Sequence, residues 1–527
     1  MHILDPVMLN RLLYIFLLVF LFRIATLESQ SVNVPLNYWG YDFLYRCEAM
    51  NLISTHDLRT RPLSRTNFSA IIRSIEKAVS NKPNQFSRTD WRQFDQLKSD
   101  FSDELFLSSS EPHLLEYREK QSLFYLDALA AQSVIVNRSD QYNEESLLSE
   151  TMLGGILRGH LGQKLGFYSQ ARNTIIKGKD DVQEEDEVFD PSQGSPTVVS
   201  GSNLIRDQAI AYLVYEKPWL RVQIGRDRQS WGPGYRGHLA LSGNMKPVDM
   251  LRLSTRMSSF TFSSFHAFLR DDLGAKFLAA HRLDIKIRPG FYLGATETLI
   301  YGGRDIELGY LNPIMPYHVA EHHLGDRDNN AMSIDATLTS LPAMTLYAEF
   351  FIDDMTTTQN LTRFYGNKFA FTLGGLCANP LSLQNTDLRI EYTRIEPYVY
   401  THWDSLNIYR HAGEPIGHWA KPNSEVVYAR VSHRLNRDVQ IQGSMEQVRH
   451  GKGDFNTISR PDEGVSKSFL QGIIERRRLF TLKIVDQIRR DFFASISYSY
   501  SDTDNANNIA GEQFVDHIAR FELSINY

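Results

Sequence analysis

The sequence is short of cysteine and of long apolar runs, and each shortage excludes a class of protein. Two cysteines in 527 residues, Cys47 and Cys377, cannot form a disulfide framework. The longest apolar run, Leu12 to Phe22, is too short for a membrane-spanning helix, which needs ~20 residues, and is typical of a secretory signal. We therefore expect residues 1–30 to be a signal peptide and the exported protein to lack a transmembrane helix.

Basic charge and enzyme motifs are also lacking. Lysine and arginine total 56 against 62 aspartate and glutamate, and the resulting net charge of -6 argues against nucleic acid as a partner. No P-loop, HEXXH or GxSxG pattern occurs, so the sequence predicts no cofactor, no metal site and no enzyme. An enzyme whose serine, histidine and aspartate come from distant positions stays the least favoured alternative.

Residues 31–112 predict a small helical domain. In "LNYWGYDFLYRCEAMNLI", Trp39, Phe43, Cys47 and Met50 recur at helical spacing and form one apolar face. Two further amphipathic helices are predicted in "TRPLSRTNFSAIIRSIEKAVS" and "SRTDWRQFDQLKSDFSDELF". Three such helices can bury one another as a packing or assembly module. The first two also resemble a single S-layer-homology repeat, a unit that often binds cell-wall polymers but usually occurs in threes.

From about residue 113 the apolar residues recur with a period of two. In "DLRIEYTRI", for example, Leu388 and Ile390 alternate with Arg389 and Glu391. A soluble sandwich and a membrane barrel both fit one such strand, but the long unbroken strand-rich region favours the barrel. The predicted fold class is therefore mainly β, a large antiparallel transmembrane β-barrel of about 16–18 strands over residues 113–527, preceded by a small periplasmic helical domain.

The last predicted strand, "HIARFELSINY", is amphipathic. Phe521, Leu523, Ile525 and Tyr527 share one face, and polar residues occupy the other. A final strand of this kind, ending on an aromatic residue, resembles the assembly signal of bacterial outer-membrane proteins. We therefore expect the protein in the outer membrane, with outer-membrane lipid around the barrel and the outer-membrane assembly machinery recognising this strand.

Arginines and aromatic residues gather in the glycine-rich stretch "GRDRQSWGPGYRGHLALSGN". Arg228, Trp231, Tyr235 and Arg236 offer forked donors and flat faces that suit sugar rings with acidic substituents. The glycines let the backbone pass close to another surface. A strand precedes the stretch and no helical run follows, so we expect a structured turn or an inward segment of the barrel. The alternative is a lumen constriction whose arginines only balance acidic residues.

The acidic residues available to this stretch bear on that choice, because a buried arginine without a partner is costly. Asp227 and Asp249 are the nearby acids, and the stretch holds three arginines. One arginine is then left for a ligand, unless Glu307 or Asp326 reaches across the lumen.

Two further stretches supply candidate polysaccharide contacts. "ELGYLNPIMPYHVAEHHLGDRDNNAMSIDA" contributes Tyr310 and His318, and its histidines and aspartates match no zinc spacing. The predicted loop His402–Glu425 contributes Trp403 and Tyr409. The acidic stretch Lys177–Asn203 is unsuited to a spanning strand and predicts a solvated loop.

The stretches "GRDRQSWGPGYRGHLALSGN…PVDMLRL", "ELGYLNPIMPYHVAEHHLGDRDNNAMSID" and "VPLNYWGYDFLYRCEAMNLI" together resemble the capsule assembly Wzi family. The resemblance implies an outer-membrane barrel of about eighteen strands with a periplasmic helical part. It also implies a lectin that holds capsular polysaccharide at the cell surface. Helices that precede the barrel are similar to those of a Bacteroidetes-type branch of the family.

The sequence leaves three functions open. A protein that anchors capsular or other surface polysaccharide is favoured by the aromatic and charged loops. A porin-like channel for small solutes or saccharides would use Arg252, Arg256, Arg389 and Glu391 along its lumen, and an outer-membrane enzyme is the third alternative. Through its helices the protein is also expected to meet periplasmic envelope components.

Overall fold

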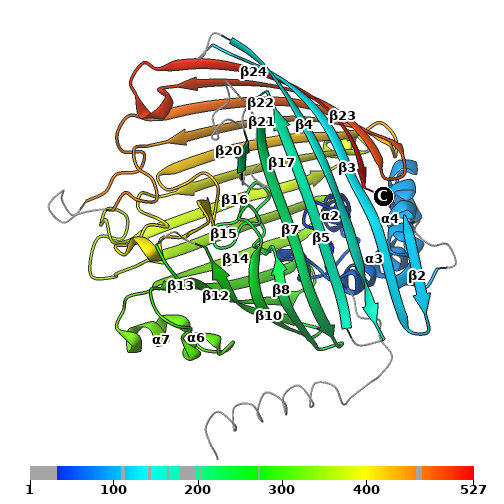
Figure 1. Cartoon of the computed structure of the whole chain (residues 1–527), viewed down its shortest axis with the longest axis horizontal. Coiled ribbons are helices and arrows are strands. Elements are labelled where there is room, and N and C mark those ends of the chain that lie inside the picture. The colour runs from blue at the N-terminus through cyan, green and yellow to red at the C-terminus, as the bar shows by residue number, and fades with distance from the viewer. Residues whose placement is uncertain are drawn as a thin grey trace, which may run out of the picture.

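The chain folds into a closed β-barrel whose N-terminal helices lie in one end (Figure 1). This computed structural model describes the following residues: 32–107, 113–140, 144–162, 165–178, 198–200, 203–270, 273–458 and 466–526. The predicted signal peptide and the terminal Tyr527 lie outside the described residues. Of the stretch Lys177–Asn203, predicted to be a loop, residues 179–197 also lie outside them, whereas Val198–Ser200 form a short strand.

Eighteen antiparallel strands form the wall of the barrel in the part of the chain that the structure describes. They are β3 (Ser122–Ser139), β4 (Glu144–Leu161), β5 (Leu165–Lys177), β7 (Asn203–Glu216), β8 (Leu220–Asp227), β10 (Val248–Arg256), β11 (Phe260–Leu269), β12 (Lys276–Arg288), β13 (Phe291–Gly302), β14 (Asn329–Leu341), β15 (Met344–Asp354), β16 (Lys368–Ala378), β17 (Thr386–Ile395), β20 (Ser424–Arg434), β21 (Val439–His450), β22 (Glu475–Arg489), β23 (Phe492–Asp504) and β24 (Gln513–Asn526). The circle closes where β24 pairs with β3. The strand number and the fold class confirm the sequence prediction.

Shorter elements decorate this wall. β2 (Leu115–Glu119) pairs with β3, and β6 (Val198–Ser200) pairs with β7. Two small pairs stand apart from the wall, β1 (Thr60–Arg61) with β9 (Ser230–Trp231) and β18 (Arg410–His411) with β19 (Glu414–Pro415). The helices are α2 (Gly40–Ala49), α3 (Arg65–Asn81), α4 (Arg88–Asp100), α5 (Ser102–Leu105), α6 (Leu308–Leu311) and α7 (Tyr317–Leu324). No helix among the described residues is long and apolar enough to cross a membrane.

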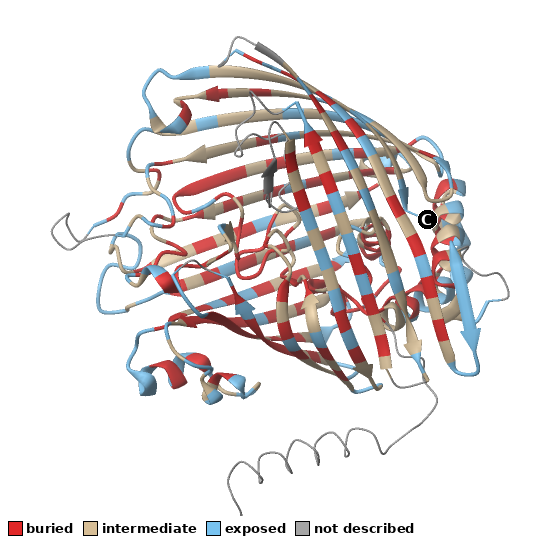
Figure 2. Ribbon diagram, in the orientation of Figure 1, coloured by how far each residue is buried: buried red, intermediate tan, exposed pale blue. Residues whose placement is uncertain are grey.

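The two faces of the wall follow the alternation read from the sequence. On β17, Arg389 and Glu391 are buried on the lumen side, whereas Ile390 is 52% exposed on the outside. Figure 2 shows the same alternation of buried and exposed residues along many strands. Leu373, Val431 and Phe521 are further exposed apolar side chains of the wall strands. This apolar outside is the surface that a membrane barrel presents to lipid.

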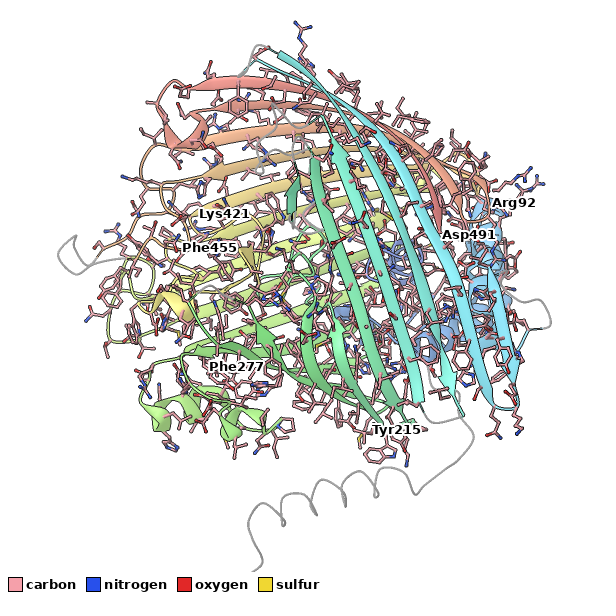
Figure 3. The ribbon with its side chains drawn as sticks, in the orientation of Figure 1. Arg92, Tyr215, Phe277, Lys421, Phe455 and Asp491 are labelled. Carbon is pink, nitrogen blue, oxygen red and sulfur yellow. The ribbon has the colours of Figure 1, made fainter. Side chains whose placement is uncertain are left out.

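The two ends of the barrel differ. At one end the strands are joined by short turns, such as the one between Arg288 and Phe291, and at the other end by long loops. The N-terminal helices lie at the short-turn end, where Arg490 of the β22–β23 turn donates to Asp100 of α4 at 3.1 Å. Figure 3 labels Arg92 of α4 and Asp491 of this turn on the same side of the molecule. Short turns face the periplasm in bacterial barrels, so this placement supports the predicted periplasmic position of the helices.

The helices share their core with the barrel wall. The predicted apolar face of α2, with Phe43 and Cys47, packs against α3 and α4 in one cluster that also contains Leu376 and Ala378 of β16. Arg46 is buried at this contact and pairs with carboxylates of both parts. The helices are therefore anchored to the inner wall, and the predicted domain boundaries at residues 30 and 112 lie outside the described residues.

Candidate binding site in the barrel lumen

Residues 228–247, here called the inward segment, leave the wall between β8 and β10 and run into the lumen. Trp231 of the segment pairs with Thr60 of the helical part, so the segment meets the N-terminal helices inside the barrel. The prediction of an inward segment is confirmed. The site is built around this segment.

Two wall carboxylates hold the backbone of the inward segment. Glu391 of β17 accepts hydrogen bonds from the amides of Tyr235 at 2.6 Å and Arg236 at 2.9 Å. Glu349 of β15 accepts from the amide of Leu239 at 3.2 Å. Buried carboxylates need such donors, since an unsatisfied charge in a dry interior is costly. The segment is thus fixed by its backbone, which leaves its side chains for other contacts.

The long loop between β17 and β20 covers the inward segment. The hydroxyl of Tyr400 donates to the carbonyl of Leu239 at 2.8 Å, and that of Tyr409 donates to the carbonyl of Ala240 at 2.7 Å. Together with Phe455, which Figure 3 labels, these residues form the apolar core of the lumen. This core, here called the plug, occupies the part of the lumen that lies against β10–β17 and β20.

Gly237 shows why the segment needs glycine. A Cβ atom at this position would lie 2.5 Å from Cδ2 of His418, so only glycine lets the covering loop pack this closely. Burial, and to a smaller extent the nearby Arg236, lowers the pKa of His418 to about 3. Burial also holds the pKa of His238 well below its ordinary value. Both imidazoles are therefore neutral inside the plug.

The aromatic and basic side chains of the segment interlock with the wall. The ring of Tyr235 lies against the guanidinium groups of Arg389 and Arg430, with its centroid at 4.0 and 4.6 Å from them. Arg236 donates through Nε to Glu446 at 2.5 Å and stacks over Trp419. Cation–π contacts of this kind hold a guanidinium in place while its edge stays available.

The predicted acid partners were wrong in part. Asp249 pairs with Arg226, as the sequence allowed. Asp227 accepts from the side chain of Asn33 at 2.7 Å and from the backbone amide of Arg228 at 2.8 Å. Glu307 and Asp326 do not reach across the lumen, because they flank the helices α6 and α7 on the outside of the wall. Three acids on distant strands meet the segment: Glu349, Glu391 and Glu446. Only their place on the polar side of an alternating strand could have pointed to them.

A cavity of about 310 Å³ opens beside the inward segment. It lies between the segment, residues 33–37 and the inner faces of β5 and β7. Its charged lining residues are Arg61, Arg172, Arg228, Arg236 and Asp227. Tyr235 also lines it, and an adjoining cavity of about 580 Å³ continues along the wall past Arg158 and Lys483. In the cavity of about 310 Å³, the excess of guanidinium groups over carboxylates suits an anionic ligand.

Three predicted contact residues therefore line one cavity, and five do not. Arg228, Tyr235 and Arg236 are brought together at its edge. Trp231 and Tyr409 are both 0% exposed and belong to the core of the plug, so neither ring faces a ligand in this structure.

The remaining three predicted contacts lie elsewhere. Trp403 is 62% exposed on the covering loop. Tyr310 is buried under the outer helices, where its hydroxyl donates to Asp328 at 2.7 Å. His318 is exposed on α7, and its amide donates to Glu297. Among the described residues, no group of three or more histidine, cysteine, aspartate or glutamate side chains is arranged to hold a metal ion.

A plugged eighteen-strand barrel with helices at its short-turn end can be compared with known proteins. The family model of capsule assembly protein Wzi matches residues 207–516, which is more than half of the chain. The chain belongs to the Wzi family. This is a capsule assembly family and not an enzyme family. No curated protein matched the sequence.

Solved structures give the same fold for this Wzi-family chain. Wzi of Escherichia coli, an outer-membrane protein involved in group 1 capsule assembly and described as a carbohydrate-binding β-barrel, superposes with a TM-score of 0.62. The two sequences are 13% identical, and the match covers 95% of this chain and 100% of that one. OccAB1 of Acinetobacter baumannii is 8% identical over 77% of this chain and 96% of its own, with a TM-score of 0.45. The Wzi-family chain is thus an outer-membrane β-barrel, and the predicted family, fold and location are confirmed.

Proposed function

We propose that this Wzi-family protein binds an acidic surface polysaccharide in the lumen cavity and holds it at the outer membrane. The arginine-rich lining beside the inward segment is the observation that carries the proposal. Family membership and the carbohydrate binding ascribed to Wzi of Escherichia coli support it. Capsular polysaccharide is the expected ligand, in keeping with the sequence prediction.

The contacts follow from the geometry of the three lining residues. The side chain of Arg236 stays 36% exposed although Glu446 takes its Nε, so its terminal nitrogens can pair with a sugar carboxylate. Arg228 and the edge of Tyr235 add a second basic group and an aromatic surface at the same cavity. Trp231 and Tyr409 support the site by packing. Trp403 remains a candidate contact for polysaccharide outside the barrel.

Three of the four wall charges that would line a porin-like channel are occupied in this structure. Arg389 lies against the ring of Tyr235, and the backbone of the inward segment covers Glu391. Arg256 pairs with Asp57 of the helical part at 2.7 Å. These contacts favour anchoring over free conduction. Purified protein in planar bilayers should therefore show no large steady conductance.

Arg236→Ala tests the proposal against its matched control Arg226→Ala. Both arginines pair with one carboxylate near the same segment, but Arg226 belongs to β8 and does not line the cavity. Arg236→Ala should weaken binding of an acidic capsular polysaccharide to the purified barrel and release it from cells, while Arg226→Ala should not. Heat-modifiable migration on a gel checks the fold of each variant. Equal binding by the two folded variants would contradict the proposal.

The other predicted partners stay part of this proposal. The position of α4 beside the short turns supports a contact of the helices with periplasmic envelope components. The amphipathic strand β24 closes the barrel against β3, which is the position in which the assembly machinery would recognise it. Deletion of β24 should therefore abolish the folded barrel in outer-membrane fractions.

A further inference from the structure

The helices α6 and α7 lie against the outside of the barrel wall at its long-loop end (Figure 1). Their buried side chains pack on outward-facing residues of β12 and β13. That these wall residues face outward follows from the alternation, because Leu278, Ala280 and Ile300 point into the lumen core. The cluster outside the wall consists of Phe277, Ala279, Leu299, Tyr301, Tyr310, Tyr317 and Ala320. Phe277 is labelled on the wall beside the two helices in Figure 3.

The wall beneath α7 carries polar groups. Glu297 points outward and accepts from the amides of Tyr317 at 3.0 Å and His318 at 2.7 Å. His281 of the next strand lies 2.8 Å from the same carboxylate. A carboxylate and an imidazole would be costly against hydrocarbon, so the helices cover a patch of wall that lipid could not. They occupy the place of lipid there.

The contact lies at the level of lipid-facing residues. Glu297 precedes the last residue of β13 by five positions, which is about 16 Å along the strand at ~3.3 Å per residue. In the β13–β14 register it stands opposite Met332, which is exposed on the outside of the wall. The start of α7 therefore reaches into the apolar band, which is ~25 Å tall in such barrels.

From α6 to the first turn of α7 the outer helices expose a group of apolar side chains, whereas the polar exposed residues His322, His323 and Asp326 lie at the end of α7. Leu308 and Ile314 are each 77% exposed, and Val319 is 51% exposed. Exposed Leu311 and Leu324 extend this surface. It is continuous with the barrel–lipid interface, because α7 packs on β14, the strand that carries the exposed Met332 and Ile334.

We propose that α6 and α7 form a membrane-embedded outer hairpin that immerses Leu308, Ile314 and Val319 among the acyl chains of the outer leaflet. Helices with one apolar face lie in a membrane interface in this way. The outer hairpin covers the polar patch around Glu297 on one side and meets lipid on the other. It would fix the depth of the long-loop end of the barrel in the membrane.

Site-directed spin labelling in reconstituted membranes tests this proposal. After both native cysteines are replaced by alanine, nitroxide labels are placed at Leu308→Cys and Ile314→Cys in the full chain. Ile334→Cys on the outer wall is the lipid reference, and Thr358→Cys in an exposed loop is the water reference. Labels on the outer hairpin should collide readily with oxygen and be shielded from a water-soluble nickel chelate, as at Ile334. All four side chains are at the surface, and heat-modifiable migration verifies each fold.

Two results would overturn the proposal. Nickel accessibility at Leu308 and Ile314 equal to that at Thr358 would place the outer hairpin in water. Dipolar broadening that disappears on dilution with unlabelled protein would assign the surface to a second copy of the chain instead of lipid. If one labelled variant fails to fold, Val319→Cys reports on the same surface.

Discussion

Replacing Glu391 by glutamine should release the inward segment while the barrel stays folded. The carboxylate accepts from two segment amides, those of Tyr235 and Arg236, and from the hydroxyl of Tyr347 at 2.7 Å. Glutamine keeps one acceptor oxygen but turns an NH2 group toward donors. At least one charge-assisted hydrogen bond is then lost and two donors face each other.

The magnitude follows from these contacts. A hydrogen bond to a charged group contributes about 1.5–3 kcal/mol, and a buried donor left unsatisfied costs about 1–3 kcal/mol. These effects overlap, so we expect the local free energy of opening of the segment to fall by about 2–4 kcal/mol. Every 1.4 kcal/mol is about tenfold in an equilibrium, which predicts amide exchange roughly 30-fold to 1000-fold faster across residues 228–247.

Hydrogen–deuterium exchange measured by mass spectrometry resolves the segment from the wall strands. Glu425→Gln is the matched control, because this carboxylate lies on the neighbouring strand β20 and pairs with Arg449, away from the segment. Wall peptides should keep their protection in both variants. If residues 228–247 exchange at the wild-type rate in folded Glu391→Gln protein, the idea that wall carboxylates hold the segment is refuted.

Three further results are expected. Gly237→Ala should destabilise the plug by about 1–3 kcal/mol and speed proteolysis of the covering loop, because the new Cβ atom would lie 2.5 Å from the His418 ring. Gly443→Ala is the control and should have neither effect, because no atom lies within 4 Å of a Cβ at that position. Since burial lowers the pKa of His418 from 6.5 to about 3, its contribution to stability is complete above pH 6.5 and is lost as the pH falls below that value. The loss should reach about 2 kcal/mol at pH 5, and thermal unfolding of His418→Gln should show a flatter pH profile. Arg46→Met leaves buried Asp90 without its guanidinium partner and Asp387 with Arg434 alone, and should cost about 3–5 kcal/mol in thermal unfolding. Lys98→Met, which removes a more exposed pair, should cost at most ~1 kcal/mol.

The barrel could be predicted because its signal is local. Each strand carries its own alternation of apolar and polar residues. As the sequence indicates, Ile390 lies on the outside of the wall and Glu391 on the inside. The apolar faces of the N-terminal helices are equally local. Their insertion into the barrel end could not be predicted, because it depends on pairs such as Arg46 with Asp387, which are far apart in sequence.

The candidate site was only partly predictable. The aromatic composition of their stretches suggested that Trp231 and Tyr409 bind sugar. Both instead belong to the apolar core inside the lumen, where large aromatic side chains are equally common. The aromatic residues and histidines around Tyr310 and His318 are typical of a binding loop, yet this stretch folds back over the outer wall. Nothing local distinguishes a loop that enters the lumen from one that leaves it.

The way the segment is held explains why the cavity stays basic. Glu349 and Glu391 are neutralised largely by backbone amides, which carry no net charge, so these two carboxylates need not take up the guanidinium groups of Arg228 and Arg236. Glu446 already pairs with Arg236; had Glu349 and Glu391 also paired with arginines of the segment, the lining of the cavity would be closer to neutral. Anchoring by backbone therefore keeps a net positive lining beside a rigid segment, and that combination is what binding of a polyanion requires.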